Sequence, residues 1–260
     1  MTLTTLLRRL GYALGLPVIL VALWWVTSAG STNFFWPPLG RVMDAFAETW
    51  FGPRFAADVL PSLTRLLIGY LVALVVGVGL GVAVGSWRPL RESIEPSLEF
   101  IRAIPPPVLV PIFILFFGIG ETMNVTVIII GCVWPILLNT TEGVRSVDEV
   151  QRDTAACFRF RAASRLLRLT LPAASPQIAA GARQALSVAI ILMVISELFA
   201  TTNGLGFVIV QFQRSFQIPQ MWSGIILLGL IGVALSLIFR FFESRALSWY
   251  TGMRHSERGE

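Results

Sequence analysis

Uncharged and mostly apolar runs recur along the chain, each long enough to cross a lipid bilayer as a helix. A membrane-spanning helix needs about 20 predominantly apolar residues, and long runs without alternation favour helices over the strands of a barrel. The pattern predicts six spans, at about residues 10–29, 64–86, 104–120, 122–141, 178–201 and 222–242. Only the fifth carries charges well inside it, Arg183 and Glu197.

Shorter patterns predict how these spans begin and pack. Residues 42–50 form an amphipathic pattern, which we expect to lie as a short helix along the membrane interface. Gly77, Gly81 and Gly85 recur at four-residue spacing in the second span, so they share one face that another helix can approach closely. Three consecutive prolines at 105–107 open the third span, so its helix should start late or kink.

The first span has an alternative interpretation as a secretory signal peptide. Arg8 and Arg9 precede an apolar stretch that ends in small residues at 28–30, an arrangement typical of such peptides. The stretch is long for the apolar part of a signal peptide, and Trp24 and Trp25 resemble an interfacial aromatic belt. We therefore favour a retained helix.

Composition supports a membrane protein and excludes several other classes. Charged residues make up 13% of the chain and hydrophobic residues 55%, whereas soluble domains contain about 25% charged residues. A soluble enzyme, a disordered chain and a nucleic-acid binder are therefore excluded. The sequence contains no lysine, so it has no P-loop lysine for nucleotide phosphates. Cys132, Cys157 and His255 are too few for a zinc site, and we expect no metal or cofactor in this chain.

The distribution of arginine predicts how the chain is oriented in the membrane. If six spans alternate, 15 of the 20 arginines fall on the side that holds both termini. Because cytoplasmic loops carry an excess of positive residues, that side is predicted to be the cytoplasm. The chain is thus expected to be a multi-pass membrane protein with both termini in the cytoplasm.

The longest segment between spans, at about 142–177, has structure of its own. It carries six arginines and four acidic residues together with apolar residues at helical spacing. This pattern predicts a short amphipathic helix pair on the cytoplasmic face. From the pattern alone, docking of a partner protein and anchoring on anionic lipid are both open.

Within this segment, the residues from Asp153 to Pro172 resemble the EAA loop of ABC importer permeases. The family pattern is Glu-Ala-Ala, three residues, Gly, nine residues, Ile, one residue and Leu-Pro. The residues matching the loop, and thereby implied to couple to an ATPase, are Asp153, Thr154, Ala155, Arg159, Leu169, Leu171 and Pro172. Arg159 stands at the glycine of the pattern, so the turn between the two helices must form without the conformational freedom of glycine.

A second set of motifs is similar to the nitrate/sulfonate/taurine/bicarbonate branch of these permeases. The fifth span begins with Gly181-Ala-Arg183 and ends with Glu197 before Gly204-Leu205-Gly206, and the second span opens with Ser62-Leu63-x-Arg65. The resemblance extends over nearly the whole chain, from about residue 17 to 250.

The resemblance implies an all-α membrane protein with six transmembrane helices, the type I ABC importer permease fold with cytoplasmic coupling helices. It also implies that the chain lies in the bacterial cell membrane. It further implies a homodimer around one translocation path, a cytoplasmic ATPase dimer docked on the EAA loops, and an extracytoplasmic substrate-binding protein. ATP and Mg²⁺ would be bound by the ATPase, so this chain would have no catalytic residues. The solute is expected to be small and anionic. We also hypothesise that Arg159 pairs with an acidic residue of the ATPase.

The fifth span carries a polar stripe that is a candidate lining of the pore or gate. Arg183, Ser187, Glu197 and Thr201 fall within about 80° of one another on a helix. A charge facing lipid costs about 2.5–3.5 kcal/mol, so this stripe should face protein or water. The alternatives are structural: Arg183 snorkels or bonds carbonyls, and Glu197 caps a helix or pairs with Arg65 or Arg214.

Two other function classes compete with the importer permease. An ion-gradient-driven secondary transporter or channel usually has internal repeats, and none is visible in this sequence. An intramembrane enzyme would need a metal cluster, a nucleophile elbow or paired carboxylates within one span, which the sequence also lacks.

Overall fold

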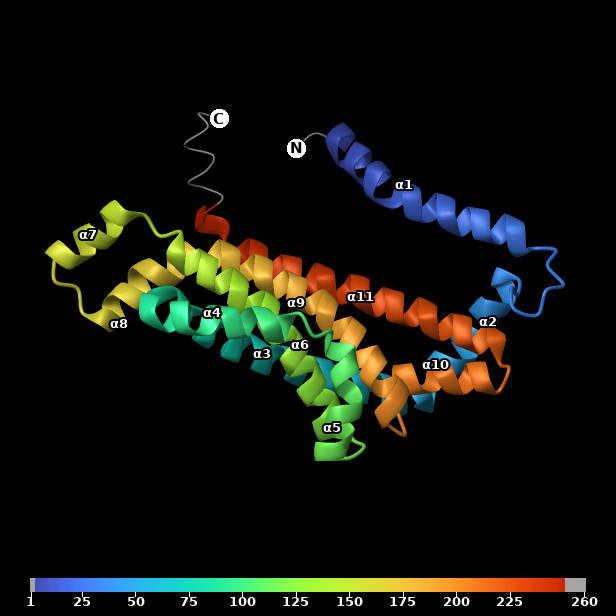
Figure 1. Cartoon of the computed structure of the whole chain (residues 1–260). Coiled ribbons are helices and arrows are strands. Elements are labelled where there is room, and N and C mark those ends of the chain that lie inside the picture. The colour runs from blue at the N-terminus through green and yellow to red at the C-terminus, as the bar shows by residue number, and fades with distance from the viewer. Residues whose placement is uncertain (1–2, 251–260) are drawn as a thin grey trace.

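Helices are the only regular elements in the part of the chain that the computed structural model describes, residues 3–250. Side chains are described from Gly15 onward, apart from Glu95, Arg102 and Ala200. The predicted all-α fold class is confirmed. The long helices form an elongated bundle (Figure 1). We call the end that carries α7 (Glu149–Cys157) and α8 (Ala162–Arg165) the loop end, and the end that carries α2 (Leu39–Trp50) and α10 (Leu205–Arg214) the far end.

Four helices in the described residues are long and apolar enough to cross a membrane, and each overlaps one predicted span. They are Phe55–Ser86, which joins a π-helical turn (Phe55–Val59) to α3 (Leu60–Ser86); α6 (Glu121–Arg145); Ala162–Phe199, which joins α8 to α9 (Leu171–Ala200); and α11 (Ile218–Ala246). Two shorter apolar helices, Gly15–Ser28 of α1 (Leu3–Ser28) and Pro106–Phe117, coincide with the other two predicted spans. The count of six spans stays a prediction.

The third predicted span is broken at its prolines. A 3-10 turn, Pro106–Leu109, precedes α5 (Val110–Phe117), so the regular helix starts late. Proline lacks a backbone N–H and its ring clashes with the preceding turn, which explains this start. Before the break lies α4 (Arg88–Arg102), an amphipathic helix that was not among the predicted elements because its charges interrupt the apolar pattern.

Glycines of α3 hold it against α6 in a parallel arrangement. A Cβ atom added at Gly77 would lie 2.8 Å from Ile136 Cβ, and one added at Gly81 would lie 2.6 Å from Thr140 Cβ. Gly85 meets Val144 in the same register. Small residues on one face thus let the two backbones approach closely, as the spacing predicted.

The core forms where α6 lies between α3 and α9. A Cβ atom at Gly181 of α9 would lie 2.7 Å from Asn139 Cβ, and one at Gly143 of α6 would lie 2.9 Å from Gln177 Cβ, so these two helices pack closely and antiparallel. Fully buried core side chains include Leu66, Met123, Ile128, Ile136, Leu192 and Met193.

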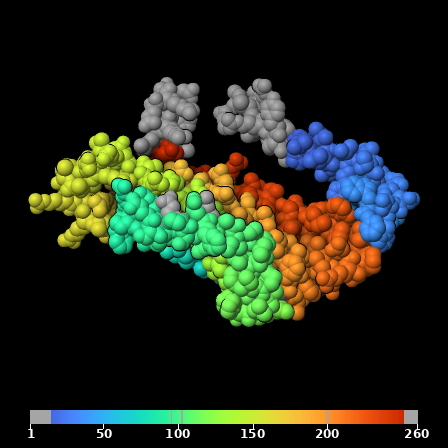
Figure 2. Space-filling model, viewed as in Figure 1, coloured from blue at the N-terminus to red at the C-terminus, as the bar shows by residue number. Residues whose placement is uncertain are grey.

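At the far end, aromatic side chains connect α1 to the rest of the bundle. The ring centroid of Trp24 lies 5.6 Å from that of Trp36 and 5.3 Å from that of Trp222. Away from this contact α1 diverges from α11, as the blue and red segments of Figure 2 show. Most apolar side chains in the described part of α1, Gly15–Ser28, and many of those of α11 are exposed, as expected of helices that face lipid. His255, Arg254 and Arg258 lie outside the described residues.

The α3–α6 contact yields a test with a matched control on the same helix. Gly81→Ala should lower the apparent melting temperature in detergent by several degrees, because overpacking costs about 1–3 kcal/mol and about 2–4 °C accompany each kcal/mol at this size. Gly79→Ala should leave it unchanged or raised, since nothing lies within 4 Å of an added Cβ and alanine favours a helix. Equal effects of the two substitutions would contradict this packing.

Candidate functional site

A single arginine joins three elements at the far end of the bundle. Arg65 of α3 is almost fully buried, and all of its guanidinium nitrogens donate hydrogen bonds. Nε and Nη2 bond the two carboxylate oxygens of Glu121 at 2.6 and 2.5 Å, and Nη1 bonds Glu197 Oε1 at 2.8 Å. Nη1 and Nη2 also bond the backbone oxygen and Oδ1 of Asn203 at 3.2 and 2.5 Å. Five bonds use the five N–H donors of arginine, which lysine cannot replace.

Glu197, the buried acid near the end of α9, connects Arg65 to the start of α10. Its Oε2 accepts the backbone N–H of Gly206 at 2.9 Å, and Ser62 Oγ lies 2.7 Å from its Oε1. Ser62 Oγ in turn accepts the N–H of Leu205 at 2.8 Å. The first N–H groups of α10, which have no partners within the helix, are thus bonded by side chains of two other helices. A negative charge is also favourable at a helix N-terminus.

The Gly-Leu-Gly motif is explained by this contact. Gly204 has φ +116°, and a Cβ there would lie 2.6 Å from Glu197 Cδ. At Gly206 a Cβ would lie 2.6 Å from the backbone oxygen of Val194. Both positions therefore require glycine, one for its backbone conformation and both for close approach.

The predicted polar stripe of α9 divides into two environments. Arg183 and Ser187 are exposed, and Arg183 forms an ion pair with Glu243 of α11. Glu197 is buried, and Thr201, half-buried, donates to the Glu197 carbonyl at 3.2 Å. The same helix face is open near its middle and loop end but is covered at the far end by α3 and α10. Glu197 pairs with Arg65, one of the two partners considered from the sequence, while its role in the pore stays a prediction.

At the loop end, α7 is capped at its start and fixed to α6. Asp148 Oδ1 accepts the N–H groups of Val150 and Gln151 at 2.8 and 3.3 Å. Arg152 Nη2 donates to the carbonyls of Val144 and Arg145 at 2.8 and 3.0 Å, which satisfies the C-terminal end of α6. The direction of α7 is therefore tied to the end of α6.

Arg159 makes the turn of the EAA loop in the conformation that glycine usually supplies. Its φ is +51°, in the left-handed region. The N–H of Phe160 bonds Ala155 O at 3.0 Å, and the N–H of Arg159 bonds Ala156 O at 2.9 Å. This pair of bonds is the Schellman motif that ends many helices. A non-glycine residue in this region costs roughly 1–2 kcal/mol, so the turn forms at the family glycine position despite the substitution.

The second predicted loop helix is the start of a much longer one. α8 continues through a π-helical turn, Leu166–Thr170, into α9. The N–H of Leu171 bonds the carbonyl of Leu166, five residues earlier. Pro172 has no N–H and cannot continue regular bonding, which accounts for a bulge beside it. The Leu-Pro of the motif thus marks the junction of loop and membrane helix.

Apolar side chains are exposed on this loop although most of its other residues are polar. Phe158 is 74% and Val150 72% exposed, and Phe160 and Leu167 are also exposed. Ala155 alone of α7 is buried. Asp153, Thr154 and Arg159 lie on the surface, whereas Leu169, Leu171 and Pro172 are half-buried at the root of the loop. Exposed apolar patches of this kind mark protein or membrane contacts.

Sequence reasoning missed Glu121, Asn203 and Glu243 as partners of the motif arginines. Each lies more than fifty residues from its arginine along the chain, and no local pattern pairs residues at that separation. Among the described residues, no group of three His, Cys, Asp or Glu side chains could hold a metal ion.

Burial of the Arg65 contacts predicts which of its two acids matters more. Glu197→Gln should lower the apparent melting temperature by about 6–20 °C, because breaking a buried ion pair costs about 3–5 kcal/mol. Glu121→Gln should change it by less than about 4 °C, since the Glu121 side chain is 65% exposed and exposed pairs contribute about 0–1 kcal/mol. A larger loss for Glu121→Gln would refute this ranking.

The comparisons with known proteins agree with these features. Residues 53–248 match the family model for the binding-protein-dependent transport system inner membrane component. The taurine transport system permease protein TauC of Escherichia coli is 28% identical over 251 residues, 94% of this chain and 91% of that protein. The bicarbonate transport system permease protein CmpB of Synechococcus elongatus is 32% identical over 68% of this chain and 64% of that protein.

Solved structures share the fold. An inward-facing structure of the MetNI methionine ABC transporter matches with a TM-score of 0.62 at 17% identity, covering 74% of this chain and 93% of that one. The chain therefore belongs to the family of binding-protein-dependent transport system inner membrane components, and it is a multi-pass permease subunit of an ABC importer.

Proposed function

We propose that two copies of this permease form one translocation path for a small anionic solute. An ATPase dimer in the cytoplasm docks on the two loop ends, and a binding protein delivers solute to the far ends. ATP and Mg²⁺ bind to the ATPase. This chain forms the path and passes conformational change from the ATPase to the membrane helices, rather than acting as an enzyme. The observation that carries the proposal is the exposed apolar and cationic surface of α7 and the turn after it.

Several features of the loop suit it to transmit force from an ATPase. Phe158 and Val150 offer apolar contact area, and Arg159 and Arg161 beside them are exposed cations. The Arg152 bonds to the end of α6 and the continuous helix from α8 into α9 join this surface to two core helices. A displacement of α7 would therefore be passed to α6 and α9 together.

The open face of α9 is the proposed wall of the path. Gln177, Gln184 and Ser187 are exposed on a helix that is mostly apolar and long enough to span the membrane. Polar side chains at membrane depth face protein or water rather than lipid, so this face suits a water-filled path between two copies. Arg183 supplies a positive charge on this face, where it forms an ion pair with Glu243. The names of the relatives TauC and CmpB, taurine and bicarbonate permeases, support an anionic or zwitterionic solute.

The proposed orientation places the loop end and both termini in the cytoplasm. Parallel packing of α3 and α6 requires the chain between them to return across the membrane, and α4 with α5 is the segment available. The arginine excess at the loop end then agrees with the positive-inside rule.

The test is co-purification with the cognate ATPase and binding protein, followed by uptake in proteoliposomes. Taurine, an alkanesulfonate, nitrate and bicarbonate are the solutes to compare. ATP-dependent uptake of one of these solutes supports the proposal, and uptake driven by an ion gradient without ATP refutes it. Scrambling residues 155–160 should abolish ATPase association, and retained association would remove the loop from its proposed role.

Substitutions at Arg159 separate its charge from its backbone conformation. Arg159→Gly should preserve the turn, since glycine adopts positive φ without strain, and should keep most ATPase association. Arg159→Glu should reduce association about tenfold or uncouple ATP hydrolysis from transport, because it reverses the charge offered to an acidic partner. The measurements are the association constant between permease and ATPase and the number of ATP molecules hydrolysed per solute transported, for both variants. Unchanged coupling in Arg159→Glu would refute the charge pairing.

A further inference from the structure

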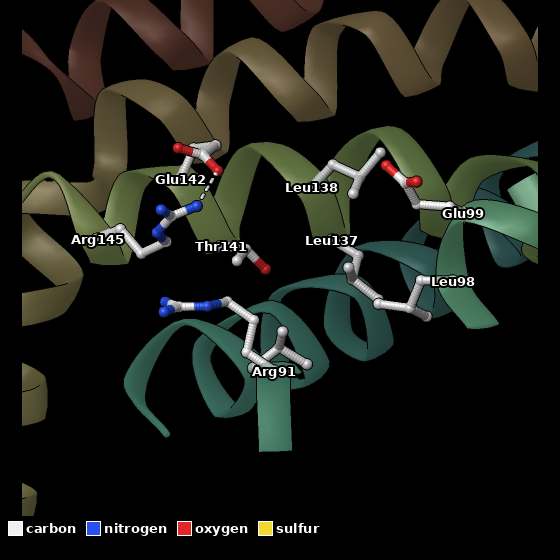
Figure 3. A pocket seen from close by; sticks show the side chains of 9 residues that line it. Arg91, Leu98, Glu99, Leu137, Leu138, Thr141, Glu142 and Arg145 are labelled. Carbon is white, nitrogen blue, oxygen red and sulfur yellow. Dashed lines mark hydrogen bonds and ion pairs between the residues drawn. The ribbon is translucent and has the colours of Figure 1, made fainter. Parts of the chain in front are cut away.

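A pocket near the loop end lies outside the features described so far. It has a volume of about 260 Å³ and is bounded by α4 and α6, with Val84 of α3 beside them. Figure 3 shows its lining from close by. Neither the turn at Arg159 nor the exposed face of α9 contributes to it.

One end of the pocket is cationic. The guanidinium groups of Arg91 from α4 and Arg145 from α6 both lie there, and Glu99 lies toward the other end (Figure 3). Arg145 Nη1 bonds Glu142 Oε1 at 2.8 Å. Among the side chains that the structure describes, no carboxylate lies within ion-pair distance of Arg91. Glu92, the acid next to it in sequence, is bonded to Arg88 at 2.7 Å. Among the lining side chains that the structure describes, this end therefore holds two guanidinium groups against one carboxylate.

The remaining wall is apolar. Leu98 of α4 and Leu137 and Leu138 of α6 line the pocket beside the cationic end. Guanidinium groups favour phosphate and sulfonate-like oxyanions because their planar donors match the oxygen atoms. An apolar wall next to such a group suits a ligand whose oxyanion carries a hydrocarbon chain.

We propose that this pocket binds the phosphate group of an anionic phospholipid, with Arg91 and Arg145 on the phosphate and the start of an acyl chain along Leu98 and Leu137. Basic pockets between membrane helices on the cytoplasmic side are suited to anionic head groups. The inference rests on the proposed function in one respect, the cytoplasmic orientation of the loop end. A bound lipid would hold α4 against α6 near the loop that receives the ATPase.

The test uses the permease–ATPase complex in nanodiscs of phosphatidylcholine with or without phosphatidylglycerol. Native mass spectrometry counts retained phosphatidylglycerol, and thermal unfolding reports stabilisation. Wild type should retain the lipid, and Arg91→Gln should weaken retention about tenfold, as expected for a lost charge-assisted hydrogen bond. Arg88→Gln is the matched control, because Arg88 lies one turn away on α4, is 80% exposed and does not line the pocket. Equal retention by wild type and Arg91→Gln overturns the proposal.

Further arms identify the source of the oxyanion and guard against misfolding. Inorganic phosphate and hexanesulfonate are titrated into complexes in phosphatidylcholine nanodiscs. If they bind in an Arg91-dependent manner while phosphatidylglycerol is not retained, the lipid assignment is overturned. Arg91→Lys keeps the positive charge. If Arg91→Gln loses the lipid because the charge is lost and not because the protein misfolds, Arg91→Lys should recover part of the retention. ATPase co-purification is measured in the same samples. A wild-type complex that keeps the ATPase but retains no phosphatidylglycerol refutes this inference alone, and a wild type that retains the lipid but does not bind the ATPase refutes only the proposed docking.

Discussion

The far end of this permease depends on one buried guanidinium. Arg65 lies at the start of a membrane helix, and its charge could not remain there unpaired. Glu197 supplies the opposite charge from α9, and the same carboxylate caps α10 through Gly206. Three segments that are distant in sequence are therefore fixed by one ion pair, and Gly204 is required because the carboxylate occupies the space of a side chain.

Close packing of α3 on α6 forms the second constraint, and it acts along the full length of the membrane core. In lipid, apolar surface gains little from burial against another helix, so association depends on close contact between backbones. The glycines of α3 provide that contact at regular intervals toward the loop end. α6 then has α9 on its other side, which makes it the central helix of the subunit and the one whose end receives Arg152.

The loop end illustrates how a motif can keep its geometry while losing its signature residue. Asp148 begins α7 and a Schellman turn ends it, so the helix is fixed at both ends by local bonds. Arg159 adopts a positive φ in that turn at a modest energetic cost. Its side chain places a cation on the exposed surface. After this turn, α8 continues into α9 as one helix, with a π-bulge beside Pro172 where proline prevents regular bonding.

The membrane class, the apolar helices and the position of the loop that resembles the EAA motif could be predicted from the amino-acid sequence, because hydrophobic length, charge bias and local motifs are properties of neighbouring residues. The sequence also indicated the glycine face of α3. The tertiary structure was needed to show that Arg65 bonds Glu121 and Asn203 as well as Glu197. It was also needed to show that Arg183 pairs with Glu243 and that α4 and α6 enclose a pocket. These contacts join residues far apart in the chain, and only the packing of whole helices brings them within bonding distance.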